Sequence, residues 1–156
     1  MIDPLRESIR QVLSEQKTAM RAIVDGLSDE GLNWLPGGND ETNSIAQMLS
    51  HALEAERFLA ATSIDATVDR SREAQFQIEN VSATDVLVTI DQSEQIVNGF
   101  LDQLTAEHLG QEVSRGTALG SRSHNGSWWL LHAIEHSNEH IGQASLTRQL
   151  FEGRSV

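Results

Sequence analysis

The chain has 156 residues, 38% of them hydrophobic, and these values are typical of one domain with a substantial core, which we expect over residues 1–156. With 23 acidic and 11 basic residues its formal net charge is -12, which disfavours binding to nucleic acid or to an anionic membrane surface. The absence of cysteine excludes disulfides, thiolate metal ligands and a cysteine nucleophile, so any thiol chemistry must use an external thiol.

The first predicted element is an amphipathic helix near the N-terminus. Asp3 is its expected N-cap and Pro4 its first helical residue, and apolar residues then recur at spacings of three and four. The helix should end near Asp25, because Gly26 can adopt the left-handed backbone conformation that closes a helix. Residues 28–43 follow as a loop with one short turn, in which Trp34 is the expected apolar anchor.

The second predicted helix begins after a cap at Asn43 or Ser44. Its apolar residues form one arc, and His51 falls inside that arc, so we expect its imidazole to point into the interior. Glu56 also leans inward, and two interpretations of it stay open. It accepts a hydrogen bond behind a metal ligand, or it is solvated at the rim of the helix contact.

The connection over residues 61–81 is polar and longer than the usual span of about 2 to 8 residues between bundle helices. It is either a functional segment or a flexible surface loop. Arg70 and Arg72 are therefore only weak candidates for binding an anionic substrate. The third helix should begin at Ser82 or Thr84, where the helical spacing of apolar residues resumes.

Glycine marks two features of the C-terminal part. Residues 110–127 are rich in glycine and serine and are predicted to form a loop that leads into the fourth helix, over 128–150. Gly142 lies within that helix, where glycine costs about 1 kcal/mol relative to alanine. Its presence suggests a close approach of another helix or room beside a bound ion.

The fourth helix carries His132, His136 and His140 at intervals of four residues. Each step of four turns a helix by about 40° and climbs about 6 Å, so the outer two lie about 12 Å apart and cannot share one ion. His136 and His140 lean toward the apolar side of the helix, whereas His132 lies near its boundary. The later pair is therefore the better candidate for metal ligands.

These histidines are either hydrogen-bonded core residues or metal ligands. A single histidine in an apolar helix is usually a core residue. Two imidazoles in one low-dielectric region lose hydration and repel each other if protonated, so a metal ion that needs both neutral is the more economical explanation. An inward histidine on the second helix would be the third ligand. We predict a metal site of His51, His136 and His140, with His132, Glu56 and Trp129 in the pocket or in contact with the ligands.

Four long amphipathic segments without a convincing strand predict an all-α fold, an antiparallel four-helix bundle with long crossover connections. The N-terminus has no apolar stretch of signal-peptide length, and no run approaches the roughly 20 apolar residues of a membrane span. We therefore expect a cytoplasmic protein.

The motifs LNWLPGG and SIAQMLSHALEAERF, with EHSNEHIGQ on the last helix, resemble the DinB-like superfamily of four-helix metalloproteins, and the likeness spans nearly the whole chain. The resemblance implies a divalent metal ion on His51, His136 and His140, with zinc expected and nickel or another ion as alternatives. His132 is additional to the family pattern. The resemblance also implies a homodimer and a small-molecule substrate, because characterised members include transferases and isomerases that use low-molecular-weight thiols such as bacillithiol or mycothiol.

Two kinds of function stay open from the sequence. The first is an enzyme whose metal ion keeps a position for a small thiol or for water, which would make it an S-transferase, an isomerase or a hydrolase. The second is a non-catalytic, stress-related bundle that stores, senses or is stabilised by metal. Glu135 and Glu139 point about 100° away from the neighbouring histidines, so no protein general base is identified. An open coordination position would favour the enzyme, and a fourth protein ligand the structural site.

Overall fold

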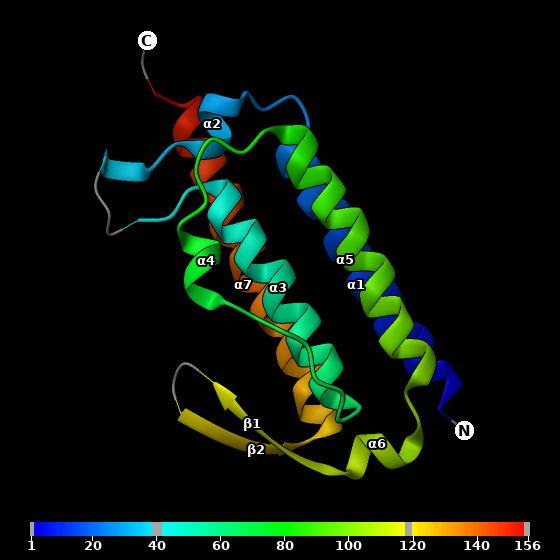
Figure 1. Cartoon of the computed structure of the whole chain (residues 1–156). Coiled ribbons are helices and arrows are strands. Elements are labelled where there is room, and N and C mark those ends of the chain that lie inside the picture. Colours follow the sequence, from blue (N-terminus) through cyan, green and yellow to red (C-terminus); the bar gives the residue numbers. More distant parts are fainter. Residues whose placement is uncertain (1, 39–41, 118–119, 155–156) are drawn as a thin grey trace.

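The computed structural model describes residues 2–38, 42–117 and 120–154, and four long helices dominate it (Figure 1). These are α1 (Asp3–Val24), α3 (Ile45–Ser63), α5 (Ala83–Gln103) and α7 (Gly126–Glu152). The shorter elements are α2 (Asp29–Asn33), the 3-10 helix η1 (Pro36–Gly38), α4 (Arg72–Phe76), α6 (Ala106–Gly110) and the strands β1 (Glu112–Thr117) and β2 (Gly120–Asn125).

The four long helices form the predicted bundle. α1 and α7 run in one direction, and α3 and α5 run in the other (Figure 1). α3 packs most extensively on α7 and then on α5, and α1 contacts both α5 and α7. The antiparallel pairs are thus α1 with α5 and α3 with α7, while the long crossover from α3 lets α5 run parallel to it. Within the three described ranges, none of the helices is both long and apolar enough to cross a membrane.

The segment between α5 and α7 is not the loop that the sequence predicted. α6 leads into β1, which pairs antiparallel with β2 from Glu112 opposite Asn125 to Thr117 opposite Gly120. Among the residues of these two strands, Val113 alone is buried. The hairpin therefore lacks the alternation of apolar and polar residues by which a strand is recognised in a sequence.

The helix ends follow local capping chemistry. Ser44 and Ser82 cap α3 and α5, each accepting a hydrogen bond from the backbone N–H three residues later. Gly26 has a φ of 68°, the left-handed conformation that was predicted for it. The prediction for Asp3 was wrong, because the N-cap of α1 is Ile2 and Asp3 lies in the first turn. Its negative charge there favours the helix through the dipole rather than through a cap.

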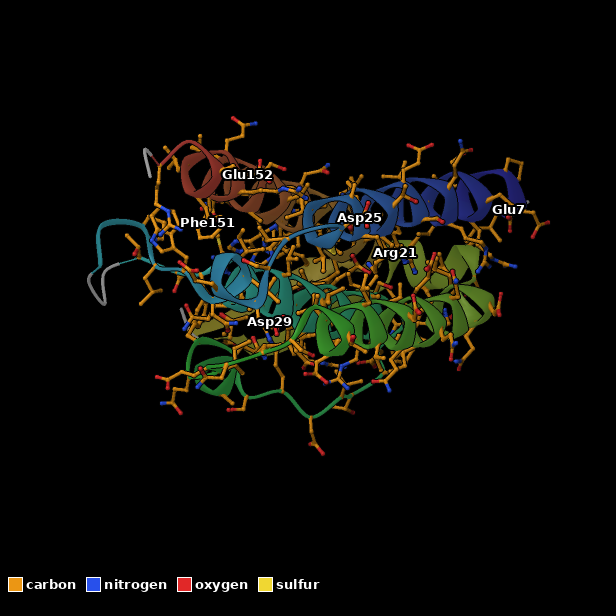
Figure 2. The ribbon with its side chains drawn as sticks, turned by 90° about the horizontal axis from the view of Figure 1, so that it is seen from above. Glu7, Arg21, Asp25, Asp29, Phe151 and Glu152 are labelled. Atoms are coloured by element: carbon orange, nitrogen blue, oxygen red, sulfur yellow. The ribbon has the colours of Figure 1, made fainter. Side chains whose placement is uncertain are left out.

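The bundle interior is mainly aliphatic but contains one charged pair. Its large, fully buried side chains include Met20, Leu32, Ile45, Leu49, Leu53, Ile90, Leu101 and Leu130. Lys17 of α1 and Glu56 of α3 pair inside this apolar region. On the outside, Arg21 lies on the side of α1 that faces α5 (Figure 2), and it pairs with Asp91 and Glu94 at 2.7 and 2.6 Å. α1 is thus joined to α3 inside the bundle and to α5 at its surface.

Candidate metal centre

His51, His136 and His140 converge in the contact between α3 and α7. One ring nitrogen of each lies within 4.8 Å of the others. The ring centroids are 5.1 Å apart for His51 and His136, 4.9 Å for His51 and His140, and 4.6 Å for His136 and His140. His51 is buried, and the two histidines of α7 are half-buried. The structure therefore brings together the three residues that the sequence singled out.

Hydrogen bonds orient two of the three rings. Nδ1 of His51 lies 3.1 Å from Oε1 of Gln75, and Nδ1 of His140 lies 2.9 Å from Oε1 of Gln143. An amide oxygen only accepts, so each Nδ1 carries the proton and each Nε2 keeps the lone pair that a metal ion needs. α4 supplies Gln75, and it also supplies Phe76, whose ring centroid lies 4.6 Å from that of His51.

The third ring, that of His136, has a buried nitrogen without a protein partner. Among the described residues, nothing forms a hydrogen bond with its Nδ1. Burial, and then the proximity of His140 and His51, lower the pKa of His136 from 6.5 to about 3, so the ring is neutral at pH 7. A buried polar atom without a partner needs an explanation. Three convergent imidazoles fit a divalent ion that would use their lone pairs.

Glu56 lies deeper than the rim interpretation allowed. Its side chain is fully buried, so it is not a solvated glutamate at a rim. One carboxylate oxygen pairs with the ammonium of Lys17, and the other accepts a hydrogen bond of 3.1 Å from Ser137 Oγ. Lys17 was not among the residues predicted near the site. Its spacing of four from Leu13 and three from Met20, both buried, was the signal that it lies on the inner side of α1.

His132 lies beside the triad of His51, His136 and His140 and is not part of it. Its ring centroid is 6.0 Å from that of His136, and its Nδ1 lies 3.2 Å from a carboxylate oxygen of Glu135. The ring lies 4.7 Å from that of Trp128, which in turn stacks on His124 of β2 at 3.7 Å. A row of rings thus runs from the hairpin along α7 to the triad.

Trp129 joins the hairpin to α7. Its side chain is buried, and its indole Nε1 donates to the backbone oxygens of Val113 and His124 at 3.2 and 3.1 Å. These two acceptors lie on β1 and β2. Trp129 was predicted to lie in the pocket or beside the ligands, and in the structure it holds the hairpin against the helix that carries two of the histidines.

Arg70 lies near the triad on the crossover between α3 and α5. Its guanidinium carbon is 5.3 Å from the ring centroid of Phe58, and its positive charge is a minor cause of the low pKa of His136. Arg70 and Gln75 both line a surface cavity of about 510 Å³. The predicted role of Arg72 concerns a side chain outside the described part of the structure.

The cluster contains three ligand atoms from the described residues. Among the described side chains, which leave out those of residues 72 and 73, no aspartate, glutamate or further histidine joins His51, His136 and His140 in it. A tetrahedral ion at this place would keep one position for a ligand other than a described histidine, aspartate or glutamate. Such an open position is typical of catalytic rather than structural zinc sites.

Comparisons with known proteins extend these observations. A sequence model of the DinB superfamily matches residues 13–144. The structure is similar to that of a conserved protein from Enterococcus faecalis, with a TM-score of 0.73, 14% identity, and coverage of 95% of this chain and 97% of that one. It is also similar to a DinB-like protein from Bacillus cereus, with a TM-score of 0.70, 18% identity, and coverage of 92% and 91%. For a DinB-like protein from Bacillus subtilis the TM-score is 0.71, with 18% identity and coverage of 96% and 95%. A search of curated proteins found no match.

Proposed function

Because the chain belongs to the DinB superfamily, we propose that it is a divalent-metal-dependent enzyme that activates a small thiol for S-transfer or isomerisation. The observation that carries this proposal is the convergence of His51, His136 and His140 to within 4.8 Å, with no acidic side chain of the described residues in the cluster. The absence of cysteine from the chain agrees with an external thiol.

The donor set suits one divalent ion. Three imidazole nitrogens are typical ligands of zinc, and nickel or another divalent ion remains an alternative. Because the three ligands are neutral, they leave the double charge of the ion uncompensated, which favours an anionic thiolate as the fourth ligand. A bound ion would supply Lewis acidity, lowering the pKa of a thiol or a water molecule at the open position.

The protein side chains would prepare the ligand atoms. Gln75 and Gln143 accept from Nδ1 of His51 and His140, which would leave Nε2 of each ring to bind the ion. The low pKa of His136 means that this ring needs no deprotonation before it binds metal at neutral pH. The site is therefore prepared for an ion before one binds.

Substrate contacts are proposed for the side chains next to the triad. The rings of His132 and Trp128 lie in contact at a tilt of 33° beside His136 and offer a partly apolar surface. Arg70 lies over Phe58 and offers a positive charge. We assign His132 a lesser role than the triad, lining the pocket rather than holding the ion.

The test begins with metal analysis of the purified protein. The cobalt-substituted protein is then titrated with low-molecular-weight thiols, and the expected result is sulfur-to-metal charge-transfer absorption followed by thiol transfer to a reactive electrophile. His136→Ala should abolish this absorption. The matched control is His108→Ala, because His108 lies on α6 and caps that helix rather than joining the triad.

Other outcomes would select the alternative functions. Metal binding without thiol ligation across the panel, together with a water ligand that ionises near neutral pH, would indicate a metal-dependent hydrolase. A cobalt spectrum of a closed tetrahedron made by protein ligands alone would indicate a non-catalytic metal-binding bundle. Each outcome contradicts the thiol proposal.

We propose further that residues 1–156 form one domain of a cytoplasmic homodimer, as the family resemblance implies. Leu131, Leu146 and Leu150 on α7 are 66%, 56% and 50% exposed, which agrees with a helix face that a second copy covers. Light scattering after size-exclusion chromatography should give twice the chain mass of 17.2 kDa. A mass of one chain would contradict the dimer.

A further inference from the structure

A buried ion pair lies inside the bundle and is joined to α7 through a serine. Lys17 of α1 and Glu56 of α3 form it, with 1% and 0% of their side chains exposed. Ser137 of α7, itself fully buried, donates a hydrogen bond of 3.1 Å to Glu56. Burial of two charges is unfavourable unless they are paired, and apolar replacements of such pairs are often as stable or more stable. Stability alone therefore does not account for this cluster.

Apolar residues lie on both the buried and the exposed sides of α7. Trp129 and Leu130 are buried, whereas Leu131, Leu146 and Leu150 are half or more exposed. A rotation of α7 about its axis would bury some of these side chains while exposing others. Hydrophobic burial alone therefore discriminates weakly between neighbouring rotations of this helix.

Small side chains in the α3–α7 contact weaken that discrimination further. Ala52 of α3 and Ala144 of α7 lie in one core cluster, and Ala133 of α7 packs with Leu59 of α3 in another. An alanine presents a single methyl group, which interlocks less with its neighbours than a longer side chain does. A directional interaction between α3 and α7 would supply the missing specificity.

The polar cluster, which consists of Lys17, Glu56 and Ser137, requires the same rotation of α7 as the histidine triad does. His136 directly precedes Ser137, so their side chains point about 100° apart around the helix. When Ser137 points toward Glu56, His136 points toward the side of the contact on which His51 lies. Glu56 follows His51 by five residues and lies about 140° from it around α3. The two groups thus lie on different sides of one helix contact.

We propose that Lys17, Glu56 and Ser137 are positioning residues for the histidine triad, an inference that rests on the proposed metal centre. The ion pair holds the carboxylate of Glu56 in place, and Ser137 fixes the rotation of α7 against it. His136 and His140 then face His51 before an ion binds. Buried polar groups are known to specify register between helices in this way, at a cost in stability.

The test separates positioning from stability with two variants and one control. Ser137→Ala removes the hydrogen bond to Glu56 and leaves the ion pair intact. The double variant Lys17→Met with Glu56→Leu replaces the pair by apolar side chains of similar size. The control is Ser93→Ala, because Ser93 is also buried but lies on α5, and its hydroxyl has no hydrogen-bond partner among the described residues.

Three measurements are made on each protein, and the first is its melting temperature by calorimetry. The zinc dissociation constant is determined by competition with a chromophoric chelator, and nuclear Overhauser contacts between the rings of His51 and His140 are recorded in the metal-free protein. We expect zinc affinity to fall about 10- to 100-fold in Ser137→Ala and in the double variant. The ring contacts should weaken in both, while the melting temperature of the double variant stays equal or rises. Ser93→Ala should match the wild type in zinc affinity and in the ring contacts.

Retention of wild-type zinc affinity and ring contacts in Ser137→Ala and in the double variant would overturn the proposal, because apolar packing would then set the rotation. If the double variant does not fold, Ser137→Ala decides the question. If the wild type binds no zinc, the proposed metal centre fails, while the ring contacts of the metal-free proteins still decide whether the cluster positions α7.

Discussion

His136 is kept neutral by its surroundings. Its pKa of about 3 arises first from burial and then from the nearby imidazoles of His140 and His51. Protonation would place a charge in a region of low dielectric, next to two other imidazoles whose own positive charge would repel it. At the scale of single residues, this makes His136 the centre of the candidate site.

Replacement of His136 should therefore abolish metal retention. His136→Ala removes one of the three converging imidazoles, and we expect a metal content near zero after dialysis against a weak chelator. His132→Ala should retain metal, because the ring of His132 lies 6.0 Å from that of His136 and outside the cluster. Equal metal loss in the two variants, measured by atomic emission, would show that His132 is a ligand.

The low pKa of His136 also predicts a pH dependence of the metal-free protein. In the unfolded chain this histidine is protonated below its ordinary pKa of 6.5, whereas in the folded protein it stays neutral down to about pH 3. The unfolded state thus binds more protons in this window, so the free energy of unfolding should fall as the pH is lowered from 6.5 to 3. Urea denaturation in the presence of chelator measures this fall. His136→Gln cannot be protonated, and an equally steep fall in that variant would contradict the assignment.

The short elements of the chain support the site that the long helices form. α4 is five residues long, yet it brings Gln75 to Nδ1 of His51 and Phe76 to the ring of that histidine. The hairpin is held on α7 by the indole of Trp129. At the scale of elements, the long connection between α3 and α5 is part of the candidate site.

The contribution of α4 can be measured through Gln75. Gln75→Leu removes the acceptor that orients His51, and we expect zinc affinity to fall about 10- to 100-fold, as is typical for residues behind a metal ligand. The control is Gln77→Leu, because Gln77 ends the same helix but is exposed. Equal zinc affinities of the two variants by chelator competition would show that His51 is oriented without Gln75.

Two glycines of α7 should respond oppositely to alanine. A Cβ at Gly126 would lie 2.1 Å from the backbone oxygen of His108 and 2.5 Å from that of Ser63, so Gly126→Ala should destabilise the fold by about 1 to 3 kcal/mol. A Cβ at Gly142 would meet no described atom within 4 Å, so the expected close helix approach there was wrong. Gly142→Ala should stabilise the protein by up to about 1 kcal/mol. Urea denaturation of both variants measures these changes, and destabilisation by Gly142→Ala would contradict the open space.

At the scale of the whole molecule, an ion in the triad would connect α3 to α7 and so oppose unfolding. An ion that binds the folded state alone stabilises it by about 4 kcal/mol at a free concentration of roughly a thousand times its dissociation constant. For a domain of this size that corresponds to a rise in melting temperature of about 8 to 16 °C. Calorimetry of wild type and His136→Ala, each with zinc and with chelator, measures the rise. A similar shift in the variant would place the stabilising ion elsewhere.

Sequence patterns that span a few residues were enough to predict the four long helices. They also narrowed the start of each of two helices to a pair of residues, of which Ser44 and Ser82 are the N-caps in the structure. The same short-range pattern indicated that His51 faces inward and that His136 and His140 share a helix side. These features depend on helical periodicity and on side chains that bond to nearby backbone, so neighbouring residues contain the necessary information. The metal-binding role of the three histidines stays a prediction.

Tertiary structure alone decided the rest. The hairpin forms without an alternating apolar pattern, because its strands are mostly exposed and are anchored by Trp129 from another element. The contact of Gln75 with His51 and the pairing of Lys17 with Glu56 join residues 24 and 39 positions apart. Whether a polar side chain is buried with a partner or exposed to water depends on which segment packs against it. Periodicity along one helix carries no information about that partner, and only the packed helices supply it.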